Sequence, residues 1–196
     1  MGSIEKDALN RAQELVSVES PFKVTSLPTD VVRTDIDPDL NITATLKSGS
    51  SPIISLDLLD DIEAITELSR HMVTAASSNQ DGPRNFILKS EVPRIFALGG
   101  DLALFRYYIE RQDAQSLKRY ARKCVRAIWA LLNGLHSNRL TISFVNGEAQ
   151  GGGFEAALAC HVFVSTRRAS FGFPEALFGL FPGMGAAPLL TSRADS

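Results

Sequence analysis

The sequence has few cysteines, no long apolar run and little excess of either charge. Each of these absences argues against a class of protein. It has two cysteines, Cys124 and Cys160, whose spacing fits neither a zinc site nor a redox pair. No apolar run approaches the roughly 18 residues that a membrane-spanning helix needs. Its 20 basic and 22 acidic residues leave a formal charge of −2, which gives no indication of nucleic acid binding. We therefore expect no metal, no cofactor, no membrane span and no nucleic-acid partner.

The first residues also lack two kinds of targeting signal. They contain no apolar segment like that of a secretory signal peptide, and Lys6 stands where a myristoylation signal has Ser or Thr. The expectation is a cytoplasmic protein in which Cys124 and Cys160 are buried, reduced thiols.

What is present suits one globular domain with a sizeable core. The chain has 196 residues, of which 44% are hydrophobic. Residues 1–40 contain three prolines and several aspartates, and we expect a loosely ordered lead-in with one short helix there. Residues 41–196 are predicted to form the core.

Apolar periodicity divides this core into alternating strands and helices. Strands are predicted at 41–47, 85–89, 95–98, 140–145 and 161–165. Helices are predicted from Ser55 to the polar segment 77–83, from Leu102, over 114–133, and from Phe154. This alternation predicts an α/β fold built from β-β-α units.

Two glycine clusters stand where a predicted strand ends and a predicted helix begins. They are Gly99-Gly100 and Gly151-Gly152-Gly153. Free backbone N–H groups and the helix dipole favour negative charge at such a turn. Two converging turns would form an oxyanion hole, in which each donor stabilises the anion by about 3 kcal/mol. Either cluster alone could equally be a tight turn and nothing more.

Two glutamates accompany the second cluster. Glu155 falls on the first turn of the helix after Gly153, and Glu175 follows Pro174 one strand later. The sequence around both glutamates is rich in apolar side chains: Phe154, Phe171, Phe173, Leu177, Phe178 and Phe181. Apolar surroundings favour a carboxyl with a raised pKa, as a general acid near neutral pH requires. A single glutamate here would more often be a partner of the helix dipole, but a pair is less easily explained that way.

Three ordered segments resemble the crotonase (enoyl-CoA hydratase/isomerase) superfamily. They are FALGGDL at 96–102, NGEAQGGGFE at 146–155, and the stretch from FGFPE at 171–175 to FPGMG at 181–185. Within that superfamily, LGGDLALF at 98–105, GGGFEAALACH at 151–161 and PEALFGLFPGMGA at 174–186 are similar to the diffusible signal factor synthases. The resemblance is specific from about Asn85 to Ala186.

The resemblance implies a crotonase-like β-β-α spiral core and assigns roles to matching residues. The backbone N–H groups of Gly100 and Gly152 would form the oxyanion hole around a thioester carbonyl. Glu155 and Glu175 would be the catalytic pair. By analogy with the hydratases, Glu175 would remove the α-proton and Glu155 would protonate the departing hydroxyl. No metal and no cofactor are implied.

The activity implied is dehydration of a 3-hydroxyacyl thioester combined with thioesterase activity, giving a cis-2-unsaturated fatty-acid signal for quorum sensing. The substrate would be carried by an acyl carrier protein or by CoA. Two alternatives stay open: an enoyl-CoA hydratase, and a catalytically silent crotonase-like module that binds a partner such as a signalling receptor domain.

The chain also departs from the family pattern. It stops at Ser196, whereas typical crotonases continue through a C-terminal helical region that covers the acyl pocket and supports trimers. We expect that region to be missing, and we expect a homo-oligomer, a trimer, only where it is present.

The remaining polar residues receive simpler interpretations. Asp101 is expected to cap the next helix, and His71, His136 and His161 are not expected to be catalytic. Six basic residues gather along the predicted helix at 114–133. They form either a solvated polar face or a docking surface for an acidic carrier protein. They are Arg111, Lys118, Arg119, Arg122, Lys123 and Arg126.

Overall fold

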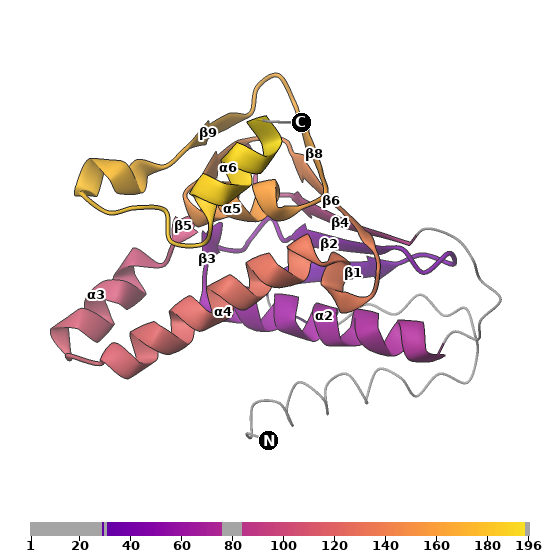
Figure 1. Ribbon diagram of the computed structural model, residues 1–196, viewed down its shortest axis with the longest axis horizontal. Helices are drawn as coiled ribbons and strands as arrows, with labels where there is room; N and C mark the ends of the chain where they lie inside the picture. The colour runs from indigo at the N-terminus through magenta and orange to yellow at the C-terminus, as the bar shows by residue number, and fades with distance from the viewer. Residues whose placement is uncertain (1–28, 30, 76–83, 195–196) are drawn as a thin grey trace.

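From the second strand onward, successive strands of the chain enter two sheets in turn, which gives the backbone a spiral course (Figure 1). The computed structural model describes residues 29, 31–75 and 84–194. The larger sheet contains, in spatial order, β1 (Val32–Ile36), β2 (Ile42–Leu46), β4 (Asn85–Ser90), β6 (Leu140–Val145) and β8 (Val162–Ser165). The smaller sheet contains β3 (Ile53–Ile54), β5 (Ile95–Gly100), β7 (Glu148–Gln150) and β9 (Ser170–Gly172).

The strand pairing follows from this alternation. Strand β1 runs antiparallel to β2, and the other neighbouring strands are parallel. Parallel neighbours need a long crossover, which the helices supply. Each turn of the spiral thus contributes one strand to each sheet and then a helix. The predicted α/β fold of β-β-α units is confirmed.

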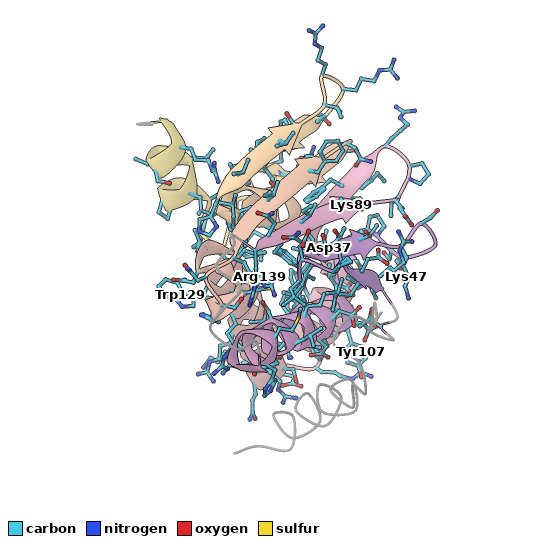
Figure 2. The ribbon with its side chains drawn as sticks, turned by 90° about the vertical axis from the view of Figure 1, so that its right-hand side faces the viewer. Asp37, Lys47, Lys89, Tyr107, Trp129 and Arg139 are labelled. Carbon is cyan, nitrogen blue, oxygen red and sulfur yellow. The ribbon has the colours of Figure 1, made fainter. Side chains whose placement is uncertain are left out.

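Helices pack against both sheets. They are α2 (Leu56–Ala75), α3 (Leu102–Glu110), α4 (Ala114–Leu132), α5 (Gly152–Ala159) and α6 (Ala186–Ala194), with short 3-10 helices η1 (Gly134–His136) and η2 (Pro174–Phe178). Helices α2 and α4 lie side by side, and Figure 2 shows them nearly end-on below the strands.

The core lies between this helix pair and the larger sheet. Its fully buried members come from both layers: Ile42 and Phe86 from the sheet, Ile65 from α2, and Leu135 from η1. Burial of each such side chain contributes about 1.5–3 kcal/mol.

Strand β6, predicted at 140–145, does not divide into a buried apolar face and an exposed polar face. Its inward residues are Thr141, Ser143 and Val145, whereas Leu140 and Phe144 are about 40% exposed on the other face. The two buried hydroxyls are satisfied, because Thr141 Oγ1 donates to the carbonyl of Leu131 (2.9 Å) and Ser143 Oγ to that of Ala157 (3.0 Å).

A buried arginine ties the larger sheet to α2. Arg139, labelled in Figure 2, is 2% exposed and donates to Ser69 Oγ and to the carbonyl of Leu40, both at 2.5 Å. It also donates to the carbonyl of Asn85 at 3.4 Å. Burial, helped by the charge of Arg84, lowers the pKa of Arg139 to about 10.

Several elements were not predicted from the sequence. Residues 32–36, expected within a loosely ordered lead-in, form strand β1 of the larger sheet. Tertiary pairing fixed this segment despite its turn-forming neighbours. Strands β3, β7 and β9 are two or three residues long, too short for periodicity to reveal. One short helix was expected within residues 1–40, of which residues 1–28 and 30 lie outside the described residues.

Candidate active site

Glu155 is buried at the start of α5. Its side chain is 1% exposed, and its Oε1 accepts hydrogen bonds from the backbone N–H groups of Met184 (2.8 Å) and Ala186 (2.9 Å). Burial raises the pKa of Glu155, the two N–H donors oppose that shift, and the nearby charge of Glu175 adds to it. The net result is a raised pKa, as the sequence predicted for a carboxyl in apolar surroundings.

Glu175 reaches the second glycine cluster from η2. A methyl group placed on Gly151 would collide with Glu175 Oε1, and one placed on Gly99 would lie 3.8 Å from that oxygen. Glu175 Oε2 is buried and has no hydrogen-bond partner among the residues that the structure describes. The carboxyl of Glu175 therefore points at the glycine turn with one oxygen still available.

The turn that receives Glu175 requires glycine. Gly151 has a φ of 51°, which side-chain-bearing residues rarely adopt, and its α carbon is where Glu175 approaches. Gly151 precedes α5, so the same turn that admits Glu175 also starts the helix that carries Glu155. One glycine thus sets the spacing of the two glutamates.

The two glycine clusters meet in space. The methyl position on Gly99 lies 3.8 Å both from the Gly151 α carbon and from the Gly152 nitrogen. Gly152 is covered by the side chains of Ile54 and Met184, each 2.7 Å from its methyl position. The predicted convergence of the clusters therefore exists, while the roles of Gly100 and Gly152 as oxyanion donors stay a prediction.

A methyl group placed on Gly100 would point toward α3 and α4. Its methyl position lies 2.7 Å from the Phe105 ring and 3.3 Å from Tyr120 Oη. The next residue, Asp101, accepts a hydrogen bond from the backbone N–H of Leu104 at 2.9 Å, which confirms its predicted role as the cap of α3.

An aromatic cluster holds the two glutamate segments together. Phe154 of α5 packs against Phe171 and Phe173, with ring centroids 5.0 and 5.1 Å apart, and Phe163 packs against Phe171 at 5.3 Å. Phe154 lies one residue before Glu155, and Phe173 lies two residues before Glu175. The packing of these rings therefore fixes one carboxyl relative to the other.

Not every apolar residue expected around the glutamates belongs to that cluster. Leu177 and Phe181 are 86% and 82% exposed, so they do not bury either carboxyl. The sequence could not separate them from Phe171 and Phe173, because the packing of those two rings on Phe154 is a tertiary contact.

Three residues beside the site were missed as functional candidates: Ile54, Tyr120 and Met184. Tyr120 lies within the helix predicted over 114–133, and a buried tyrosine needs a partner for its hydroxyl; that requirement was the available signal. Its hydroxyl donates to the carbonyl of Ile54 at 2.5 Å.

An apolar cavity of about 60 Å³ adjoins the site. Its wall includes Met184 and Ile54, which cover Gly152, and it extends between α2 and α4 to Leu58 and Ala127.

The basic residues of α4 have several different roles. Lys123 binds Asp60 and Glu63 of α2. Arg111, expected with this group, instead ends α3 as its C-cap and stacks on the Tyr107 ring at 3.9 Å. Three others are exposed along the first half of the helix: Lys118, Arg119 and Arg122. The interpretation as a purely solvated face is therefore wrong for Lys123, which joins two helices.

The structure gives clear surroundings for two of the three histidines, and the absence of a catalytic role for them stays a prediction. His161 Nδ1 accepts from the backbone N–H of Thr141 at 3.1 Å, which ties β8 to β6, and His136 is exposed in η1. Across the described residues, no group of three His, Cys, Asp or Glu side chains could hold a metal ion. The described helices include none long and apolar enough to cross a membrane.

Known proteins resemble this chain in sequence and in fold. Residues 61–195 match the family model described as enoyl-CoA hydratase/isomerase. A protein of Mycobacterium tuberculosis named a probable enoyl-CoA hydratase is 30% identical over 141 residues, which are 71% of this chain and 51% of that protein. The human mitochondrial methylglutaconyl-CoA hydratase is 33% identical over 108 residues, which are 55% of this chain and 30% of that protein.

Two solved structures show the likeness in fold. The enoyl-CoA hydratase of Bacillus halodurans superposes with a TM-score of 0.68 at 24% identity, covering 82% of this chain and 60% of its own. DspI of Pseudomonas aeruginosa superposes with a TM-score of 0.63 at 24% identity, covering 89% of this chain and 62% of its own.

The chain thus spans about half or less of the curated relatives described above. The match to the family model nevertheless covers more than half of the chain and includes both glutamates. With the crotonase-like spiral of two sheets, it shows that this chain belongs to the enoyl-CoA hydratase/isomerase family.

Proposed function

We propose that this chain carries the acid–base pair of an enzyme that removes water from, or adds water to, the α and β carbons of an acyl thioester. The observation that carries the proposal is the placement of Glu155 and Glu175 around one glycine turn, where the charge of Glu175 raises the pKa of Glu155. A pair of carboxyls with different environments is what opposite proton-transfer roles require.

The raised pKa of Glu155 favours it as the proton donor. Its Oε1 is held by two backbone N–H groups, which leaves Oε2 to carry the proton. Glu175 then takes the α-proton as a carboxylate. These are the roles that the family resemblance implied.

The proposed dehydration balances as follows. Glu175 accepts the α-proton, and the electrons of that C–H bond form an enolate whose oxygen is stabilised by the backbone N–H groups of Gly100 and Gly152. The enolate collapses to a Cα–Cβ double bond as the β carbon–oxygen bond breaks. The hydroxyl leaves as water with the proton of Glu155. Hydration is the reverse sequence.

A narrower proposal is a dehydratase with thioesterase activity on a 3-hydroxyacyl carrier protein. In the second step, water adds to the thioester carbonyl in the same hole, and the carbon–sulfur bond breaks to give a free cis-2-unsaturated acid and a thiol. The segments at 98–105, 151–161 and 174–186 support it. The exposed Lys118, Arg119 and Arg122 would bind the acidic carrier.

The main alternative is an enoyl-CoA hydratase, supported by the names of the relatives, which refer to CoA thioesters. One experiment separates the two. The protein is mixed with one 3-hydroxyacyl chain attached either to carrier protein or to CoA, and the products are identified by mass spectrometry and chromatography. Free cis-2-enoic acid from the carrier substrate supports the narrower proposal. A trans-2-enoyl-CoA without free acid supports the hydratase.

A different class of function is a silent module that binds a partner, such as a receptor domain. This alternative would be favoured if the wild-type chain turned over neither substrate and Glu155→Gln gave the same result. The oligomeric state, expected to be a trimer where a C-terminal helical region is present, is measured by light scattering in the same preparations.

A further inference from the structure

The Tyr120 hydroxyl joins two strands of the smaller sheet at the glycine clusters. Tyr120 belongs to α4 and is 5% exposed. Its Oη donates to the carbonyl of Ile54, the last residue of β3, at 2.5 Å, and accepts from the backbone N–H of Asp101 at 3.4 Å. One hydroxyl thus contacts the ends of both β3 and β5.

Each of these contacts leads to one half of the proposed oxyanion hole. On one side, the Asp101 N–H belongs to the peptide that begins at Gly100, whose methyl position lies 3.3 Å from Tyr120 Oη. On the other, the Ile54 side chain packs on Gly152, 2.7 Å from its methyl position. Tyr120 therefore connects Gly100 to the residue that covers Gly152.

The ring of Tyr120 is itself held in place. Phe105 of α3 packs edge-on against it, with centroids 5.0 Å apart at an angle of 81°, and the Phe105 ring lies 2.7 Å from the methyl position of Gly100. Burial raises the pKa of Tyr120, so its hydroxyl keeps the proton that it donates to Ile54. Ring packing and two hydrogen bonds therefore define the position of Tyr120.

We propose that Tyr120 is a positioning residue of the oxyanion hole. Its hydroxyl holds the Gly100–Asp101 peptide, and through the shared Gly100 α carbon it orients the adjacent peptide, which carries the Gly100 N–H, relative to Gly152. The inference rests on the proposed function, because it assumes that these two glycines receive a thioester carbonyl. Tyr120 acts through the backbone and does not touch the substrate. A displaced donor costs rate in the chemical step, since oxyanion stabilisation depends on geometry fixed in advance.

The test compares Tyr120→Phe with Tyr107→Phe, a matched control. Tyr107 is 48% exposed on α3, and its ring contact with Arg111 is one that phenylalanine keeps. With the substrate that the wild-type protein turns over, Tyr120→Phe is expected to lower kcat about 10- to 100-fold with KM within about twofold. Tyr107→Phe is expected to match the wild type.

A spectroscopic measurement reports on the hole without turnover. Infrared difference spectra are recorded for a saturated acyl-CoA, which cannot react, bound to each protein. A working hole lowers the stretching frequency of the thioester carbonyl. Tyr120→Phe is expected to bind the ligand and to show a smaller downshift than the wild type and Tyr107→Phe. A merely structural role for Tyr120 would reduce the bound fraction and leave the frequency unchanged.

Failure of the two proposals can be told apart. If the wild type shows no carbonyl downshift and no turnover, the proposed function is wrong. If the wild type shows both and Tyr120→Phe retains the same kcat and frequency, the positioning role is wrong. Should Tyr120→Phe not fold, hydrogen exchange of the wild-type Asp101 amide replaces it. Slow exchange is expected, and exchange as fast as in a free peptide would overturn the inference.

Discussion

Glu155 and Met184 are joined by a hydrogen bond in which the backbone N–H of Met184 donates to Glu155 Oε1 at 2.8 Å. The side chain of the same methionine covers Gly152. Residue 184 thus holds the proposed acid through its backbone and shields the proposed oxyanion donor through its thioether. The segment before α6 is therefore part of the site.

Glu155→Gln should abolish turnover without unfolding the protein. Glutamine keeps an oxygen that accepts from Met184 and Ala186, but it cannot deliver a proton. Loss of a general acid is expected to lower kcat about 10²- to 10⁴-fold. Steady-state kinetics and circular dichroism measure the two effects. Glu148→Gln, a change at an exposed carboxyl of β7, is the control and should keep full activity.

The same substitution should change how stability depends on pH. Because the folded pKa of Glu155 is raised above its ordinary value of 4.5, the folded state keeps a proton that the unfolded chain has released. The free energy of unfolding contributed by this group therefore falls as pH rises from about 4.5 through the raised folded pKa. Glu155→Gln removes this contribution, so its stability relative to the wild type should increase with pH.

Urea unfolding between pH 4.5 and 8 measures this difference. All other titrating groups are shared, so the difference between the two curves isolates Glu155. Curves that stay parallel across the range would contradict the burial of an acid with a raised pKa.

Gly151→Ala should displace Glu175. The added methyl group collides with Glu175 Oε1. The alanine must also adopt a φ of 51°, a backbone strain that costs about 1–3 kcal/mol of stability. We expect a lower unfolding midpoint and a loss of turnover. Gly49→Ala is the control, because nothing lies within 4 Å of its methyl position. Equal activity of the two variants would show that the contact between Gly151 and Glu175 is unimportant.

Lys123→Met should loosen the pairing of α2 with α4. The Lys123 side chain is 11% exposed and binds Asp60 and Glu63, whereas methionine keeps its apolar length without its charge. The expected cost is about 1 kcal/mol in urea unfolding, since both carboxylates remain partly hydrated. Lys118→Met, at an exposed position of the same helix, should change stability by less. High salt should reduce the difference between them.

Much of the fold follows from local patterns. The helical spacing of apolar residues over α2 and α4 and the apolar run of β4 were sufficient to place those elements, because each buries one continuous face. Short strands gave no such pattern. Strand β3 has two residues, and it exists because Ile53 and Ile54 pair with the end of β5.

The glutamates and glycines could be selected from the sequence, because their residue types and spacing are unusual and resemble a family. Their arrangement could not. Which of the neighbouring phenylalanines pack, and which lie in solvent, depends on the turn at η2 and on contacts with Phe154. Tyr120 looked like an ordinary core residue, because its hydroxyl partners lie 66 and 19 residues away along the chain.

The sequence by itself therefore determined the α/β class, the order of the main elements and the chemical groups available to the site. Local propensity and apolar periodicity act over a few residues, and these features need no more. The tertiary structure decided that Glu175 meets Gly151, that Met184 holds Glu155 and that Tyr120 joins β3 to β5. Those contacts arise because the spiral brings together strand ends and turns that are distant in sequence.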